Sequence, residues 1–305
     1  MNQPQDINAW SLYWSEDRLY SCVAQSSDED QKALNKLWQD FSKELDSNSR
    51  VLDLATGNGA VADALLSVNN TLQVDAVDKA SIDPKKFLKE HANLVNVNFH
   101  ADTDIFELPF KPLTFDAITS QFGIEYAGLT EASVQVMGYL KVAGRFQFVV
   151  HNVQSGIILS SSNKIIELEQ LTQQSGILQT LIEVLSGKAE FARLEALGQD
   201  YLKQDLIRSD QVSGQVFVGI ERIINGFAGQ PKESLELAVA MDLRVRSELT
   251  RLRQLIAAGQ TADSMTSWLE EVSALGIEAA FSPLYLDPIK QDYLLGWLAT
   301  GVRCK

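Results

Sequence analysis

The residues best suited to do chemistry lie in the stretch VLDLATGNGAV, residues 51–61. Its first part is typical of a buried strand, and Gly57 and Gly59 follow at once on either side of Asn58. Glycines after a strand let the backbone approach a ligand closely, because no Cβ atom obstructs it, and they leave N–H groups available. The order of residues therefore predicts a ligand-binding turn between a strand and a helix.

The same stretch fits the GxGxxA pattern of dinucleotide-binding turns, so a nicotinamide or flavin cofactor has to be considered. Asp53 argues against one, because its carboxylate would repel a pyrophosphate but hold a cationic amino-acid group. Its alternative role is to bind the amides of the turn. Asp78, which ends the next expected strand, can accept hydrogen bonds from a ribose in either ligand, whereas Asp75 is expected to face solvent. Asp53 therefore favours S-adenosylmethionine, whose sulfonium and ammonium groups are positive.

The elements that would position these acids alternate along the chain. Strands are expected at residues 50–55, 72–78, 96–101, 115–121 and 145–151. Helical or turn-like stretches are expected between them, at 59–67, 84–92 and 130–141. Short β-branched strands that alternate with helices are typical of a parallel sheet covered on both faces.

Two helices are expected before the first strand, over residues 7–24 and about 28–45. Helical spacing places aromatic residues, Trp10 among them, on one face of the first helix. These rings could close over the ligand and exclude water, or they could pack the helix against the sheet. The side chains considered for the closing role are Tyr13, Trp14 and Tyr20.

A long helical region follows the fifth expected strand. It covers residues 157–275, and one of its helices should begin at Pro231 and end at Gly259. Two further strands are expected at 277–286 and 292–304. The expected organisation is a helical cap over 1–48, a ligand-binding core over 49–156, a helical insertion over 157–275 that caps the acceptor, and the last two core strands over 276–305.

The order of these motifs resembles the motif series of class I S-adenosylmethionine-dependent methyltransferases. The resemblance covers about residues 50–151, in the pieces VLDLATGNG, VDAVD, VNFHADTDIFELPF, FDAITSQFGIEY and LKVAGRFQFVV. It implies a Rossmann-like α/β fold with a seven-stranded sheet whose last strand is antiparallel, which accounts for the two final strands. It also implies S-adenosylmethionine as the methyl donor and S-adenosylhomocysteine as the product.

The resemblance also assigns cofactor contacts to the ends of the strands. In this family the acid and glycines of the first turn hold the methionine part, and the acid after the second strand holds the ribose. The acid-plus-small pair after the third strand meets the adenine, and the residues that close the fourth border the methyl group. The matching residues are Asp53, Ala55, Gly57, Gly59, Asp78, Lys79, Asp102, Thr103, Ser120, Gln121 and Phe122.

Candidate catalytic residues on the acceptor side are Glu125, Tyr126 and His151. His151 ends an expected strand at the sheet edge where ligands bind, so it could take a proton from a hydroxyl or an amine. Its alternative role is a hydrogen-bonded histidine at a strand end. An anionic acceptor could use four arginines of the long helix, although a solvated or salt-bridged face is the commoner use of such residues: Arg244, Arg246, Arg251 and Arg253.

Composition limits the partners. The formal net charge of −14 argues against general binding of nucleic acid and of anionic membrane surfaces. Two cysteines with no CxxC pair, together with a start that lacks a signal peptide, favour a reducing cytoplasm. Three scattered histidines predict no metal site.

The expected function is O- or N-methylation of a small molecule by in-line methyl transfer. Strand 4 is not followed by an NPPY-like sequence, which disfavours methylation of the amino group of adenine or glutamine. A non-catalytic adenosyl-binding or scaffold protein is one alternative, and an NAD(P)-dependent oxidoreductase is another. A protein or tRNA acceptor stays open. The helical insertion is expected to form much of the acceptor pocket, and a homodimer interface is its second expected use.

Overall fold

The structure, a computed structural model, describes residues 4–15, 18–21, 28–84, 91–203, 212–287, 289 and 292–305. Cys22 and most of the stretch expected to be helical at 84–92 lie outside the described residues. The chain divides into two compact units, one of Met1–Leu159 with Gln254–Lys305 and one of Ser160–Arg253.

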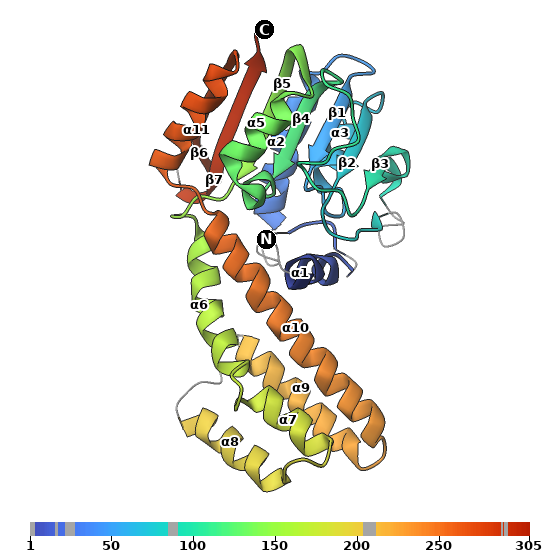
Figure 1. Ribbon diagram of the computed structural model, residues 1–305, viewed down its shortest axis with the longest axis vertical. Helices are drawn as coiled ribbons and strands as arrows, with labels where there is room; N and C mark the ends of the chain where they lie inside the picture. Colours follow the sequence, from blue (N-terminus) through green and yellow to red (C-terminus); the bar gives the residue numbers. More distant parts are fainter. Residues whose placement is uncertain are drawn as a thin grey trace. The chain divides into compact units, whose positions relative to one another are not determined.

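The first unit is built around a seven-stranded sheet of order β3-β2-β1-β4-β5-β7-β6 (Figure 1). Strands β1 to β5 pair in parallel, whereas β7 pairs antiparallel with both β5 and β6. This arrangement confirms the expected sheet and its antiparallel end. The strands are β1 (Arg50–Leu54), β2 (Gln73–Val77), β3 (Asn98–His100), β4 (Phe115–Gln121), β5 (Leu140–Val150), β6 (Ile277–Asp287) and β7 (Asp292–Arg303).

Helices cover both faces of this sheet. On one face α2 (Asp28–Lys43) and α3 (Ala60–Leu66) form a shared core with the strands. On the other face α5 (Leu129–Met137) and α11 (Ala262–Ala274) do the same. Successive residues of β1 are buried in opposite cores, Val51 in the first and Leu52 in the second, because neighbouring side chains of a strand point to opposite faces of the sheet.

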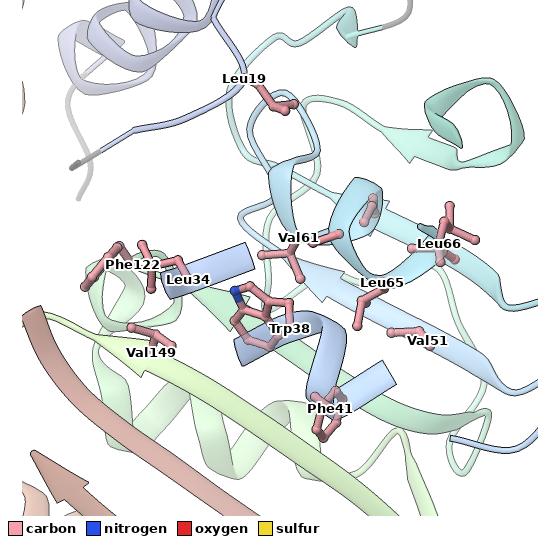
Figure 2. Packing of buried hydrophobic residues seen from close by; sticks show 14 of the residues in the cluster. Leu19, Leu34, Trp38, Phe41, Val51, Val61, Leu65, Leu66, Phe122 and Val149 are labelled. Atoms are coloured by element: carbon pink, nitrogen blue, oxygen red, sulfur yellow. The ribbon is translucent and has the colours of Figure 1, made fainter. Parts of the chain in front are cut away.

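Trp38 of α2 joins the first core to the end of β4. Figure 2 shows its ring among Val61, Leu65 and Phe41, and its side chain is almost fully buried. The indole Nε1 donates a hydrogen bond of 2.6 Å to Oε1 of Gln121. Burying such a ring contributes roughly 1.5–3 kcal/mol or more, and the hydrogen bond satisfies its N–H. The helix thereby positions a residue at the carboxyl end of the sheet.

Some expected boundaries were wrong. Helix α1 (Pro4–Trp14) ends well before residue 24, and α5 ends at Met137 because β5 begins at Leu140. The register of β4 and β5 shifts between Phe115 and Ala117, and Ala143 adopts a φ of 64°. Strand β5 thus includes Leu140 and Lys141, which were expected to belong to a helical or turn-like stretch.

Asp75 does not face solvent as expected. It is 4% exposed, and its carboxylate lies 2.9 Å from Arg50 Nη2 and 3.1 Å from His100 Nε2. The reason is that β2 is an interior strand between β1 and β3, so both of its faces are covered and a charged side chain there needs partners.

The second unit is helical and has its own core. It contains α7 (Ile177–Leu185), α8 (Phe191–Lys203) and α9 (Val212–Phe227), with most of α6 (Gly156–Leu171) and of α10 (Pro231–Ala258). Helix α10 confirms the predicted start and end. The expected insertion is therefore divided, because α11 and the last turn of α10 belong to the first unit.

The arginines of α10 mostly have acidic partners. Arg246 pairs with Asp242, Arg251 with Glu248, and Arg253 with Glu169 of α6. These ion pairs favour the salt-bridged helix face over an anion-binding cluster. Among the described residues, no helix is both long enough and apolar enough to cross a membrane.

Candidate active site

The glycine turn after β1 has the predicted form. Ala55, Gly57 and Gly59 all adopt left-handed backbone, with φ of 51°, 54° and 90°, and Gly59 is the N-cap of α3. A Cβ atom on Gly59 would lie 2.9 Å from side-chain atoms of Leu94 and Phe99. Glycine is required there both by conformation and by space.

Asp53 is buried beneath this turn. Its Oδ2 accepts a hydrogen bond of 2.6 Å from Thr56 Oγ1, and its Oδ1 accepts one of 2.8 Å from Thr119 Oγ1. Burial raises the pKa of Asp53 to about 7, an effect that the two threonine hydroxyls oppose and the charge of Asp78 increases. Asp53 is therefore a strong site for a positive group, because a cation would favour its ionised form.

Asp78 directly follows β2 and binds the glycine turn. Its Oδ2 accepts the N–H of Gly57 at 2.7 Å, and its Oδ1 accepts the N–H of Ala80 at 2.8 Å. Burial raises the pKa of Asp78 to about 6, although the hydrogen bonds from these two amides act to lower it. The amide-binding role considered for Asp53 thus belongs to Asp78. Each carboxylate oxygen keeps a second lone pair, so ribose hydroxyls can still donate to it.

A cavity of about 650 Å³ opens at this edge of the sheet. Its lining includes many of the predicted site residues: Trp14, Asp53, Ala55, Asp78, Lys79, Thr103, Gln121, Phe122, Glu125 and Tyr126. The cavity is large enough for a nucleoside-sized cofactor and a small second molecule. One continuous space therefore joins the ends of β1, β2 and β4.

Two other predicted residues, Ser120 and Asp102, are not in the lining. Ser120 Oγ donates to the carbonyl of Leu54 and accepts the N–H of Ile124, each at 3.0 Å, so it holds the turn after β4. Asp102 is exposed and accepts a hydrogen bond from Ser81 Oγ. Their contacts with a cofactor stay predictions.

The lining also contains residues that the sequence did not reveal. Thr56, a partner of Asp53, stands directly before the first glycine and could have been found from that position. Asp104, Ile105 and Phe106 follow Thr103, and at this end Lys79 Nζ lies 2.6 Å from Asp104. A third group comes from the last turns of α10, which no local pattern indicates: Gln254, Ala257 and Ala258.

The N-terminal segment covers the glycine turn. A Cβ on Gly57 would lie 2.3 Å from the ring of Trp14, so the indole rests directly on this glycine. Asn58, fully buried, donates to the carbonyls of Trp14 and Arg18 at 3.3 and 2.7 Å. Trp10 Nε1 donates to Gln254 Oε1 at 2.7 Å.

These contacts bring two of the aromatic rings to the cavity, Trp10 and Trp14, and leave two predicted ones outside its lining. Tyr13 packs edge-on against both tryptophans, and Tyr20 accepts a hydrogen bond from Asn35. The two tryptophans are thus the rings placed to exclude water, a role that stays a prediction.

The turn η2 (Ile124–Ala127) after β4 contributes to the lining and contains two of the predicted acceptor-side residues, Glu125 and Tyr126. Glu125 Oε1 accepts the backbone N–H of His151 at 2.9 Å, and burial raises the pKa of Glu125 to about 8. The hydroxyl of Tyr126 lies 3.2 Å from His151 Nε2. His151 is fully buried, stacks on Phe122 and is not in the lining of the cavity, whereas its neighbours Phe122 and Tyr126 are.

This arrangement fits S-adenosylmethionine. Asp53 is a buried acid whose described partners are two hydroxyls, so the positive part of the cofactor would supply its missing charge. Asp78 and Thr103 would contact the adenosine part. Gly57 and Gly59 are not in the lining of the cavity, and the Trp14 indole covers Gly57, so contact of these two glycines with the cofactor stays a prediction.

The methyltransferase-domain family matches residues 45–204, slightly more than half of the chain. No curated protein sequence is detectably similar to this chain. Among solved structures, the plantazolicin methyltransferase BpumL in complex with SAH is 10% identical with a TM-score of 0.48, covering 99% of this chain and 96% of that chain.

Two further solved structures are similar over shorter stretches. Phosphoethanolamine N-methyltransferase 1 of Haemonchus contortus is 16% identical with a TM-score of 0.38, covering 50% of this chain and 34% of that one. Geranyl diphosphate methyltransferase in complex with GPP and sinefungin is 17% identical with a TM-score of 0.37, covering 43% and 50%. The chain spans about half the length of the latter protein.

We predict that cofactor affinity depends on the ionisation of Asp53. A cationic ligand binds the ionised carboxylate, so below the raised pKa of about 7 binding must first displace a proton. Affinity for S-adenosylmethionine should fall several-fold between about pH 7.5 and about pH 6, as measured by calorimetric titration.

The Asp53→Asn variant should bind S-adenosylmethionine weakly, and its affinity should lose this dependence on pH. Asp46→Asn removes an exposed carboxyl and should behave as wild type. The ionisation of S-adenosylmethionine itself affects the wild type and both variants equally, so the difference between their pH dependences reports on Asp53. A wild-type pH dependence in Asp53→Asn would contradict the assigned role.

We also predict that Gly57→Ala displaces Trp14. The added Cβ would overlap the indole and strain a φ of 54°, so tryptophan fluorescence should shift to the red and cofactor affinity should fall about tenfold. Gly187→Ala is the matched control, because Gly187 has a φ of 73° but no atom within 4 Å.

The double variant Trp14→Ala/Gly57→Ala should bind S-adenosylmethionine no more weakly than Trp14→Ala alone, because the added Cβ then has no indole to overlap. Additive losses would show instead that Gly57 acts independently of the tryptophan.

Proposed function

Starting from the membership of this chain in the class I S-adenosylmethionine-dependent methyltransferase family, we propose that it methylates an oxygen or nitrogen of a small-molecule acceptor. Its methyl donor is S-adenosylmethionine. The observation that carries the acceptor proposal is that one cavity of about 650 Å³ is lined both by Asp53 and Asp78 and by Glu125 and Tyr126.

The cavity also bears on the alternatives. A non-catalytic adenosyl-binding protein would have its acceptor pocket filled by side chains, whereas this cavity continues past the cofactor residues to Tyr126, Ala257 and Ala258. An NAD(P)-dependent oxidoreductase would have to place a pyrophosphate near the buried carboxyl of Asp53, which opposes it. Both observations support methyl transfer over the two rivals.

Methyl transfer places modest demands on the protein. S-adenosylmethionine supplies a methyl group activated by its sulfonium. The protein must hold the acceptor in line at about 3 Å and exclude water, an orientation effect worth several kcal/mol. Trp10 and Trp14 cover the cavity on one side, and Phe122 and Tyr126 line it at the end of β4. In this proposal these side chains position the acceptor and exclude water from the site.

Tyr126 and His151 act as a pair in this proposal. The Tyr126 hydroxyl contacts the acceptor, and His151 positions it through the 3.2 Å contact with Nε2. The sequence placed His151 itself at the acceptor, but its burial behind Phe122 and Tyr126 supports a positioning role.

The first test is calorimetric titration with S-adenosylmethionine, S-adenosylhomocysteine and, as control, NADH. Micromolar binding of the adenosyl ligands alone, followed by acceptor-dependent formation of S-adenosylhomocysteine, is the expected result. Binding of NADH, or of no ligand, would refute the proposal.

The second test separates positioning from proton transfer. We expect Tyr126→Phe and His151→Ala each to lower kcat about tenfold with cofactor affinity unchanged, and the double variant to be no slower than either. His151→Gln, whose amide can still bond the tyrosine hydroxyl, should retain most of the activity. A His151→Gln variant as slow as His151→Ala would instead make His151 a proton acceptor.

A further inference from the structure

Gln254 is a polar side chain that lies among apolar residues of the cavity lining. It belongs to the last turns of α10, which also bring Ala257 and Ala258 to the lining. Its side chain contacts the indole of Trp10, and that ring packs edge to face on Tyr126, with centroids 5.2 Å apart. Cavities for small molecules are mostly apolar, and their few polar groups fix the orientation of the ligand. Gln254 is therefore placed to orient a ligand beside Tyr126.

The hydrogen bond with Trp10 fixes the orientation of the Gln254 amide. An indole N–H can only donate, so the carbonyl oxygen Oε1 of Gln254 must lie toward it, at 2.7 Å. The amino group Nε2 is then the other branch of the amide, and it makes no hydrogen bond with the described residues. Its N–H groups are left as donors. A donor that the protein already holds in place loses little entropy when a ligand binds to it.

The charges of the lining favour an uncharged acceptor. In the proposed function, the positive part of the cofactor meets Asp53 and the ribose meets Asp78. Among the described lining residues, the other charged side chains are Lys79 and Asp104, which pair at 2.6 Å. The carboxyl of Glu125 is buried and accepts a backbone N–H at 2.9 Å, and burial raises its pKa to about 8. An acceptor with a charge of either sign would find no unpaired counter-charge among these residues, which opposes its binding.

We propose that Gln254 is a specificity-determining residue, whose Nε2 amino group binds an uncharged oxygen of the acceptor while Trp10 holds the amide in place. The inference rests on the proposed methyl transfer and adds the class of its substrate. That class is an aromatic or apolar molecule that carries a carbonyl, ether or hydroxyl oxygen besides the atom that is methylated. The rings of Trp10 and Tyr126 provide the surface on which its apolar part packs.

The test uses three planar probes of similar shape: acetophenone, 2-phenylpropene and benzoate. 2-Phenylpropene has a CH2 group in place of the carbonyl oxygen of acetophenone, and benzoate has a negative charge. Their dissociation constants for the protein loaded with S-adenosylhomocysteine are measured by ligand-observed NMR. Acetophenone should bind at least about tenfold more tightly than benzoate. The ratio of the dissociation constants of 2-phenylpropene and acetophenone reports on the hydrogen bond, because the two probes share their shape.

The Gln254→Glu variant removes the donor and keeps an oxygen for the Trp10 N–H. It should lower this ratio about fivefold, as expected for the loss of one neutral hydrogen bond. Gln230→Glu, an exposed glutamine outside the lining, is the matched control and should leave the ratio unchanged. Trp10→Phe removes the N–H that holds the amide and should lower the ratio about twofold. A Gln254 that only anchors Trp10 would predict the opposite order, with the ratio retained in Gln254→Glu.

An unchanged ratio in Gln254→Glu, binding of benzoate as tight as that of acetophenone, or no saturable binding of acetophenone would overturn the inference. A protein that fails to bind S-adenosylhomocysteine at all would overturn the proposed function, so the two failures are distinguishable. If thermal unfolding shows that Gln254→Glu does not fold, Gln254→Met, which has neither N–H nor oxygen in its side chain, takes its place in the same comparison.

Discussion

Two carboxyl groups, those of Asp53 and Asp78, are buried at the carboxyl ends of the neighbouring strands β1 and β2. Burial raises the pKa of both, because their surroundings disfavour the ionised form of each carboxyl until a positive charge arrives. Asp78 meanwhile binds the amide of Gly57 and so sets the shape of the turn. The ligand site therefore depends on acids that the fold holds out of water and that a cationic ligand can satisfy.

The rest of the first unit serves to hold these acids in place. Thr119 on β4 reaches Asp53 across the sheet, and Trp38 on α2 anchors Gln121 at the end of the same strand. The interior position of β2 demands that Asp75 be paired as well, which Arg50 and His100 achieve. Four neighbouring strands, β3, β2, β1 and β4, are thus linked by polar contacts between their side chains.

Segments far apart in the chain complete the cavity. Trp10 and Gln254 are separated by 244 positions, and their side chains share a hydrogen bond. The N-terminal segment is tied to the glycine turn through Asn58, and η2 is tied to β5 through Glu125 and His151. The lining of the cavity is accordingly assembled from separate parts of the chain, so it depends on packing more than on any single motif.

Local patterns in the sequence determined the strands, the glycine turn, the two acids and the family. They could do so because a strand, a tight turn and the residues at its ends are specified by neighbours a few positions apart. Only the tertiary structure decided which residues pair with Asp75 and that Trp14 lies on Gly57. It also decided that His151 contacts Tyr126 outside the lining, and that Ala257 and Ala258 belong to the lining. Each of these depends on strand order, register or helix packing, which bring together residues that carry no local sign of one another.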